Sequence, residues 1–201
     1  MIPLVIATGN FHKTQEFRSL LGSEWRIEDL SDHPSLPSPE ETGTTFLENA
    51  TIKALSASRM LGSGYLVVAD DSGLEVDSLD GAPGVYSARY AGPAASDADN
   101  RRKLLHELAI RNVRGKARTA RFRCVLVLAQ GDRVLGHYSG AVEGILANED
   151  KGEGGFGYDP LFIPDGFCET FGQLPAITKN SLSHRARAAE GLAAALKSIP
   201  S

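Results

Sequence analysis

Asp70 and Asp71 are adjacent carboxylates directly after Tyr65–Ala69, a short apolar run typical of a buried strand. Two neighbouring carboxylates repel one another and lose hydration there unless a cation or hydrogen-bond donors compensate them. Mg²⁺ meets this need, because it takes one or two carboxylates and completes its shell with phosphate oxygens and water. A second acidic pair, Glu40-Glu41, would complete such a site. For the aspartate pair alone, helix capping or a solvated acidic surface is the alternative.

The turn Gly9–Thr14 follows a short aliphatic run, Pro3–Thr8, and leads into a helix predicted over Lys13–Leu21. Backbone N–H groups and the helix dipole at such a turn favour an anion, with phosphate the natural guest. Lys13 would add a positive charge, although the full spacing of a P-loop is absent. An ordinary turn with a solvated lysine is the alternative.

A glycine-rich stretch, Gly152–Gly157, matches the pattern G-x-G-x-x-G. A dinucleotide-binding fingerprint needs a strand before it and a helix after it, and neither is predicted here, so we interpret the match as accidental. The turn would instead let the backbone approach a flat ligand while the displayed rings of Phe156 and Tyr158 stack on it. A hydrophobic plug is the alternative.

The last predicted helix begins in Ser183–Arg187 with three basic side chains, those of His184, Arg185 and Arg187. Positive charge in a first turn opposes the helix dipole, so another interaction must favour it there. Donors from His184 and Arg185 would suit a keto oxygen or a phosphate. Solvated charge on an exposed turn is the alternative.

Helices and strands that would position these groups are mixed along the chain. Strands are predicted over residues 3–8, 65–69, 118–130 and 133–146, and helices over 13–21, from 46 to about 62, after an N-cap at Ser96, and over 182–196. Gly131-Asp132 predicts a hairpin between the two long strands, and Asn49 and Lys53 share one helix face. Residues 31–43 form a long loop rich in proline and serine, including Pro37 and Ser38. This pattern predicts an α/β fold with a mixed sheet.

The composition argues against several classes of function, including general nucleic-acid binding and membrane insertion. The 201 residues hold 21 Lys+Arg and 25 Asp+Glu, a net charge of −4 that argues against general binding of nucleic acid or anionic membranes. No apolar run approaches the roughly 20 residues of a membrane-spanning helix, and the start lacks the cationic segment of a secretory signal, so a cytoplasmic location is expected. Cys124 and Cys168 lack C-x-x-C spacing and are expected to be buried thiols.

Taken together, these segments resemble the inosine-triphosphate pyrophosphatase family over nearly the whole chain. The matching blocks are Thr8-Gly9-Asn10 with Lys13, Glu40–Gly43, Phe46 with Glu48–Ala50 and Lys53-Ala54, Ala69–Leu74, Gly81–Tyr90, Gly154–Pro160 and Ser183–Arg185. The family hydrolyses non-standard purine nucleoside triphosphates such as (d)ITP and XTP. The resemblance implies one domain over residues 1–201, with an elongated twisted mixed sheet flanked by helices and a cleft between two lobes. It also implies a homodimer and Mg²⁺-dependent release of pyrophosphate and a nucleoside monophosphate.

The resemblance also implies roles for individual residues. Asp71 would be the general base and a metal ligand, with Glu40 preferred and Glu41 the alternative as the second ligand. Thr8, Gly9, Asn10, Phe11, His12 and Lys13 would hold the triphosphate; Lys53, Ser72 and Lys179 would contact substrate; Phe156, Gly157, Tyr158 and Asp159 would form the base pocket; and His184 and Arg185 would face the oxygenated edge of the purine. The neighbours of Lys179 depart from the family pattern.

Three other functions are alternatives. A non-catalytic nucleotide-binding module would use the same turn and aromatic loop, but it gains little from acidic pairs beside a polyanion. A related pyrophosphatase acting on modified pyrimidines or methylated nucleotides differs only in substrate. Ser-His-Asp hydrolysis is poorly supported, because the sequence has no G-x-S-x-G elbow.

Overall fold

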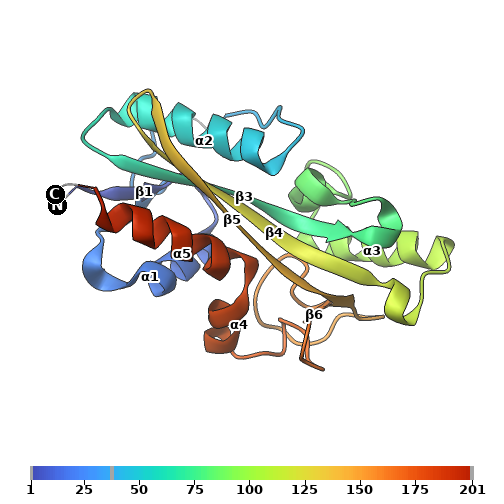
Figure 1. Cartoon of the computed structure of the whole chain (residues 1–201). Coiled ribbons are helices and arrows are strands. Elements are labelled where there is room, and N and C mark those ends of the chain that lie inside the picture. The colour runs from blue at the N-terminus through green and yellow to red at the C-terminus, as the bar shows by residue number, and fades with distance from the viewer. Residues whose placement is uncertain (1, 37–38, 200–201) are drawn as a thin grey trace. The chain divides into compact units, whose positions relative to one another are not determined.

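The computed structural model describes residues 2–36 and 39–199 and contains both helices and strands (Figure 1). The strands are β1 (Leu4–Ile6), β2 (Ile27–Asp29), β3 (Leu66–Val76), β4 (Thr119–Gln130), β5 (Arg133–Leu146) and β6 (Phe162–Pro164). The helices are α1 (Phe11–Leu21), α2 (Phe46–Leu61), α3 (Asp97–Ile110), α4 (Ala176–Leu182) and α5 (His184–Lys197). Pro37 and Ser38 of the predicted loop lie outside the described residues.

The strands are hydrogen-bonded in the order β2-β1-β3-β4-β5-β6. β1 is parallel to β2 and β3, whereas β5 is antiparallel to β6, so the sheet is mixed. β4 and β5 are neighbours joined by Gly131-Asp132, which confirms the predicted hairpin. The predicted mixed α/β class is therefore confirmed.

The described chain forms two compact units. The first comprises the chain up to Asp71, Cys124–Gly140 and the residues from Arg185 onward. The second comprises Ser72–Arg123 and Ala141–His184. The cleft that the family resemblance implies stays a prediction.

In the first unit, alternate residues of β1 pack on opposite faces of the sheet, as expected for a strand buried on both sides. Leu4 and Ile6 join a core cluster with residues of α1 and α5, while Val5 joins a second cluster with three alanines of α2. Figure 1 accordingly shows α2 on one side of β1 and β3, with α1 and α5 on the other.

The sequence fixes both ends of α2. Thr45 and Glu48 form a capping box at its start, and Gly62 ends it at a φ of 75°, a conformation that favours glycine. Ala50, Ala54 and Ala57 supply the buried side of the helix, and their small size permits close packing on the sheet. The helix therefore holds the rest of its surface, including Lys53, in a defined orientation.

The second unit has a core built around α3. Leu104 and Leu108 of α3 are fully buried in a cluster that also contains Phe122, Phe162 and Phe171. Ser96 caps α3 in a capping box with Asp99, which confirms the predicted N-cap.

The predicted closing helix is α5, and the extended backbone of Ser183, with a ψ of 160°, separates it from α4. α4, β2 and β6 were not predicted. Two expectations about local structure were wrong. Cys168 is exposed, whereas Cys124 is buried as expected. The strand predicted to end at Ala69 continues as β3 through Asp70 and Asp71, because cationic side chains compensate both carboxylates.

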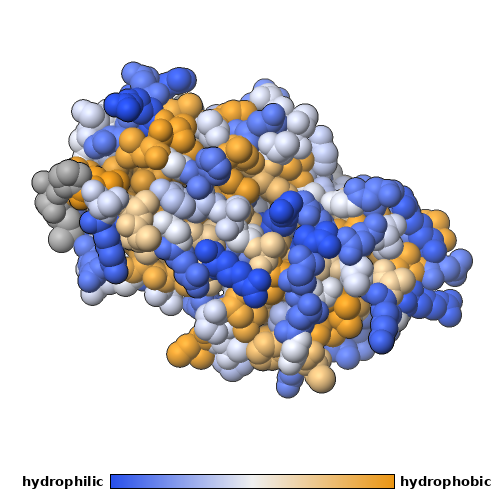
Figure 2. Space-filling model, viewed as in Figure 1, coloured by the Kyte–Doolittle hydropathy of each residue, from blue (hydrophilic) through white to orange (hydrophobic). Residues whose placement is uncertain are grey.

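On the face shown in Figure 2, hydrophilic residues interrupt the apolar ones. Among the described residues, none of the helices has the length and apolarity needed to cross a membrane.

Candidate active site

Asp71 lies in a small cluster of charged side chains in the first unit. The ammonium Nζ of Lys53 is 2.7 Å from Oδ1 of Asp71 and 3.3 Å from Oε1 of Glu41. Lys53 thus joins the acidic loop before α2 to the aspartate of β3. Asp71 and the Glu40-Glu41 pair therefore converge on Lys53. Glu41 is the member of the pair whose side chain contacts Lys53.

Burial and neighbouring charge act in opposite directions on this cluster. Burial raises the pKa of Asp71, and the positive charge of Lys53 offsets only part of that rise. Burial alone would lower the pKa of Lys53, but the charges of Asp71 and Glu41 raise it. Lys53 is therefore a stable cation beside a carboxylate that takes up a proton more readily than an exposed aspartate does.

Asn49 lies one turn before Lys53 on α2 and reaches the same aspartate. Its Nδ2 is 3.4 Å from Oδ2 of Asp71, and its Oδ1 accepts a hydrogen bond of 2.8 Å from the backbone N–H of Gly43. A Cβ at Gly43 would lie 2.6 Å from that Oδ1, so only glycine allows this approach. One buried amide thereby ties the loop carrying Glu41 to the strand carrying Asp71.

Asp70 belongs to a second network, in which its own side chain and that of Arg185 are fully buried. Its Oδ2 accepts a 2.8 Å hydrogen bond from Nε of Arg185, and its Oδ1 pairs with the ammonium group of Lys13. Arg185 also pairs with Glu16 of α1. Lys13, the lysine of the predicted phosphate turn, is thus held in place by a carboxylate on the neighbouring strand.

These two cations explain why β3 does not end at the acidic pair. Burial would raise the pKa of Asp70, yet the charges of Arg185 and Lys13 hold it well below the ordinary value of 3.8. Asp71 receives Lys53 in the same way. Because partners distant in sequence compensate both charges, the strand can carry two carboxylates through the interior.

The predicted phosphate turn is a capped helix start. Asn10 is the N-cap of α1, and its side chain accepts hydrogen bonds from the backbone N–H groups of His12 and Lys13. Thr8 Oγ1 in turn accepts a hydrogen bond from the Asn10 N–H at 3.1 Å. The turn is therefore pre-shaped, and Gly9 and Phe11 within it are exposed.

In the second unit, Asp159 organises the glycine-rich loop. Its Oδ2 accepts hydrogen bonds from the Phe156 N–H at 2.8 Å and from Lys179 Nζ at 2.7 Å. The same ammonium group lies 4.7 Å from the centre of the Phe156 ring. A Cβ at Gly155, whose φ is +74°, would lie 2.1 Å from the Asp159 carboxylate, so this position requires glycine.

Tyr158 does not take the displayed position that we expected. It is 3% exposed within the core of the second unit, and its hydroxyl donates a 2.9 Å hydrogen bond to the carbonyl oxygen of Ser87. The ring anchors the glycine-rich loop from beneath, because burying it beside other apolar side chains is more favourable than exposing it. Phe156 remains half-buried at the loop surface.

The remaining predicted residues fall in both units. Ser72 follows Asp71 along β3, in the second unit. His184 is buried in that unit with its ring stacked on Phe122 at a centroid distance of 4.8 Å. Arg185 is buried in the first unit, where two of its five N–H groups point to the carboxylates of Asp70 and Glu16.

The donor set around Lys53 suits Mg²⁺ only as a partial site. The carboxylates of Asp71 and Glu41 both contact the ammonium group of Lys53. Mg²⁺ commonly takes one or two carboxylates from a protein, and phosphate and water complete its coordination shell. Across residues 2–36 and 39–199, no group of three or more His, Cys, Asp or Glu side chains is arranged to hold a metal by itself. The residues therefore fit an ion that arrives with an anionic substrate.

Comparison with known proteins identifies the family. The Ham1 family profile matches residues 4–195. The chain belongs to the Ham1 family. The dITP/XTP pyrophosphatase of Listeria monocytogenes is 48% identical over 194 residues, which are 96% of this chain and 93% of that protein. This membership confirms the resemblance noted in the sequence.

Two further Ham1 relatives extend the comparison. A dITP/XTP pyrophosphatase of Streptococcus pyogenes is 48% identical over 190 residues, and the match spans 94% of this chain but only 57% of that longer protein. The solved structure of a HAM1 protein from Coxiella burnetii has a TM-score of 0.87 and 38% identity, covering 99% of this chain and all of that one. The fold described above is thus the fold of the Ham1 family.

Three residues of this Ham1 chain have contacts beside the predicted site that the sequence did not predict: Asp70 and Asn49, which the sequence analysis named, and Glu16, which it did not. Asp70 holds Lys13, Glu16 holds Arg185, and Asn49 links Glu41's loop to Asp71. The helical spacing of Asn49 and Lys53 was a usable signal for one of them. Glu16 gave no signal, since its partner Arg185 is far away in sequence.

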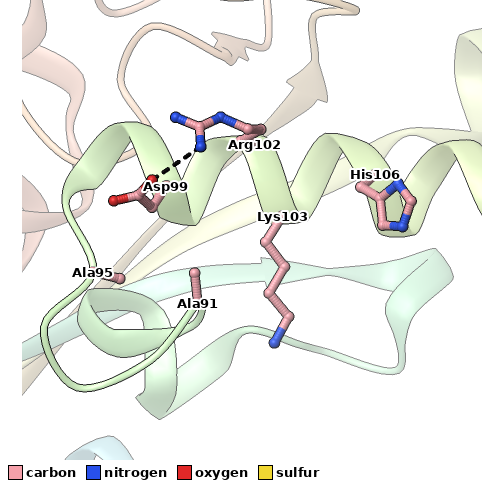
Figure 3. Close-up of a pocket in the computed structure, with 6 residues that line it drawn as sticks. All are labelled: Ala91, Ala95, Asp99, Arg102, Lys103 and His106. Carbon is pink, nitrogen blue, oxygen red and sulfur yellow. Dashed lines mark ion pairs between the residues drawn. The ribbon is translucent and has the colours of Figure 1, made fainter.

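One surface cavity has a lining that includes none of the predicted site residues. It has a volume of about 500 Å³ and lies beside α3, lined by Ala91, Ala95, Asp99, Arg102, Lys103 and His106 (Figure 3). Arg102 forms a 3.1 Å ion pair with Asp99 at its edge. Its lining contains neither the acidic pairs nor the aromatic loop, so we assign it no part in the candidate site.

Proposed function

We propose that this chain hydrolyses non-standard purine nucleoside triphosphates, ITP, dITP and XTP, to the nucleoside monophosphate and pyrophosphate. The observation that carries the proposal is Lys53 held between Asp71 and Glu41, because this brings two carboxylates and a cation to one point. The names of the Listeria and Streptococcus relatives support the reaction and the substrates.

In this proposal, Asp71 accepts the proton of the attacking water. Hydrolysis between the α- and β-phosphates requires water to be positioned and charge on the leaving pyrophosphate to be neutralised, with little covalent chemistry from the protein. Burial supports the role, since it raises the pKa of Asp71 toward the working pH and so strengthens it as a base. Lys53 and Asn49 orient the carboxylate.

The triphosphate is assigned to the turn Thr8–Lys13 and to Lys53. Lys13 supplies positive charge whose position Asp70 fixes, and Lys53 supplies a second positive charge beside the base. Such preorganised cations stabilise developing phosphate charge without reorganising during the reaction.

Asp71 and Glu41 are the residues that would hold Mg²⁺ with the nucleotide. The ion would supply charge neutralisation on the phosphates and lower the pKa of a coordinated water. Glu41 replaces Glu40 as the preferred second ligand in this proposal, because Glu41 contacts the same ammonium group as Asp71, whereas Glu40 is exposed.

The purine base is assigned to residues of the second unit, the loop Phe156–Asp159 with Lys179 and His184. Hypoxanthine and xanthine carry a 6-keto acceptor where adenine carries an amino donor, so a buried donor there leaves adenine mismatched. His184 is the residue to test, because replacing Arg185 would also remove the partner of Asp70. His184→Ala is expected to lower the preference for ITP over ATP, and an unchanged ratio would refute the role of His184.

We also propose that the chain acts as a homodimer in the cytoplasm on free nucleotides rather than on nucleic acid. The net charge of −4 supports the choice of a small substrate over a polyanionic polymer. Light scattering after gel filtration tests the dimer, and a monomer at micromolar concentration would contradict it.

The deciding experiment measures pyrophosphate release from ITP, XTP, GTP, ATP and dUTP, with and without Mg²⁺. We expect Mg²⁺-dependent release from ITP and XTP well above that from ATP and dUTP. Equal rates on ATP and ITP would contradict the proposed specificity, and preferred release from dUTP would favour a pyrimidine enzyme. Binding of ITP without release would favour a non-catalytic nucleotide module.

A further inference from the structure

Gly157 of the glycine-rich loop is held at both its N–H and its carbonyl by one helix. The backbone N–H of Gly157 donates a 2.7 Å hydrogen bond to Oδ2 of Asp97, and Nη1 of Arg101 donates a 2.7 Å hydrogen bond to its carbonyl oxygen. Asp97 and Arg101 are four residues apart on α3, so they project from one face of the helix.

The helix that carries these two side chains is itself firmly anchored. The capping box fixes its first turn, and Leu104 and Leu108 are fully buried. Asn100, between the two loop-binding residues, accepts a 2.8 Å hydrogen bond from the N–H of Ala91 and donates one to the carbonyl of Ala88. Groups mounted on a rigid helix position a loop more accurately than groups on another loop.

Arg101 is placed to hold the loop rather than to meet solvent. Its side chain is 15% exposed, and its Nε donates a 2.8 Å hydrogen bond to Asp150, on the chain just before the glycine-rich stretch. The planar guanidinium thus joins the approach to the loop and the loop itself through two separate N–H groups, which the single ammonium group of a lysine does less well. Gly157 has a φ of +61°, a conformation that glycine adopts readily and that residues with a Cβ rarely adopt.

We propose that Arg101 and Asp97 are positioning residues that determine purine specificity by fixing Gly157 and, through it, Phe156 and Asp159. The proposal rests on the assignment of this loop to the base. Asp159 and Lys179 hold one end of the loop, and Asp97 and Arg101 hold Gly157. A misplacement of about 1 Å in a site can reduce a rate by 10²-fold, so a loosened loop is expected to weaken discrimination between bases.

The test compares Arg101→Ala with Arg102→Ala as a matched control. Arg102 is the next residue on α3, 76% exposed and paired only locally with Asp99. For Arg101→Ala we expect a rise of roughly 10-fold or more in KM for ITP, a lower ITP-to-ATP ratio and a smaller change in kcat. Arg101→Lys should recover part of the ratio, and Arg102→Ala should match the parent.

Hydrogen exchange supplies a readout independent of activity. The amide of Gly157 should exchange faster in Arg101→Ala and in Asp97→Ala than in the parent or Arg102→Ala, because its hydrogen-bonded environment is loosened. Asp97→Ala also covers the case in which Arg101→Ala does not fold, since Asp97 is exposed. Unchanged exchange and an unchanged ITP-to-ATP ratio in both variants would overturn the proposal. Failure of the parent to hydrolyse ITP would instead refute the proposed function and leave the exchange result to judge the loop contacts.

Discussion

Lys53 and Asp71 form the closest contact of the acidic cluster that they make with Glu41, with Nζ 2.7 Å from Oδ1. The two residues lie on different elements, α2 and β3, and both side chains are largely withdrawn from water, at 14% and 9% exposure. The contact favours the ionised form of a buried carboxylate, although burial still raises the pKa of Asp71 above its ordinary value. The first predictions concern this pair and its neighbour Glu41.

Replacement of Asp71 by Asn should remove the proposed general base. We expect pyrophosphate release from ITP to fall about 10²–10⁴-fold, the usual contribution of a positioned acid or base. Circular dichroism should show an intact fold, since Asn keeps the shape of the side chain. Asp132→Asn is the control, because Asp132 is 86% exposed on the β4–β5 turn. Turnover near that of the parent would refute the assignment.

The pH dependence of kcat/KM should reveal the burial of Asp71. A base must be ionised, so activity should fall as pH drops through the pKa of Asp71, which burial raises above the ordinary value of 3.8. Lys53 opposes that rise, and Lys53→Ala should therefore move the acidic limb to higher pH. The position of the limb, rather than the rate itself, is the measurement. An acidic limb that stays in place after the substitution would show that Asp71 is not the titrating group.

Glu41→Gln and Glu40→Gln form a matched pair for the second metal ligand. Glu41 lies 3.3 Å from Lys53 in the acidic cluster, so its variant should need a Mg²⁺ concentration at least about 10-fold higher for half-maximal activity. Glu40 is exposed and its variant should resemble the parent. Titration of activity with Mg²⁺ distinguishes them, and the reverse pattern would return the role to Glu40.

Asp70→Asn should destabilise the fold. The substitution leaves Arg185 and Lys13 without a buried counter-charge, and breaking a buried pair costs about 3–5 kcal/mol. Urea unfolding at pH 7 measures the loss, with Asp80→Asn as the control because Asp80 is 91% exposed and already has the positive φ that Asn tolerates. A loss below about 1 kcal/mol would contradict the importance of the network.

The stability contribution of Asp70 should also depend on pH in a direction that its lowered pKa determines. The pKa of Asp70 is lowered in the folded chain, so its contribution to stability is complete above the unfolded value near 3.8 and is lost as pH falls through the lower folded value. The stability difference between the parent and Asp70→Asn should therefore stay constant from pH 7 to about pH 5 and shrink only in stronger acid. Shrinkage beginning near neutral pH would mean that another group controls it.

The amino-acid sequence alone predicted most of the elements, although not β2, β6 or α4, and most of the candidate chemistry. The capping boxes at Thr45 and Ser96 and the hairpin at Gly131-Asp132 are local signals, and each depends on residues within a few positions of one another. The motifs around Asp71 and Lys53 were equally local, and their order along the chain pointed to the family.

Only the tertiary structure decided how the charges are paired. The acidic pair ended the predicted strand because carboxylates are unfavourable inside a sheet, yet β3 continues since Arg185, 115 residues away from Asp70, supplies a counter-charge. Tyr158 is buried rather than exposed because its ring packs among apolar side chains of distant segments. Likewise, it is Glu41 rather than Glu40 that contacts Lys53. Contacts between distant segments depend on how the whole chain packs, so the residue pattern within one segment cannot predict them.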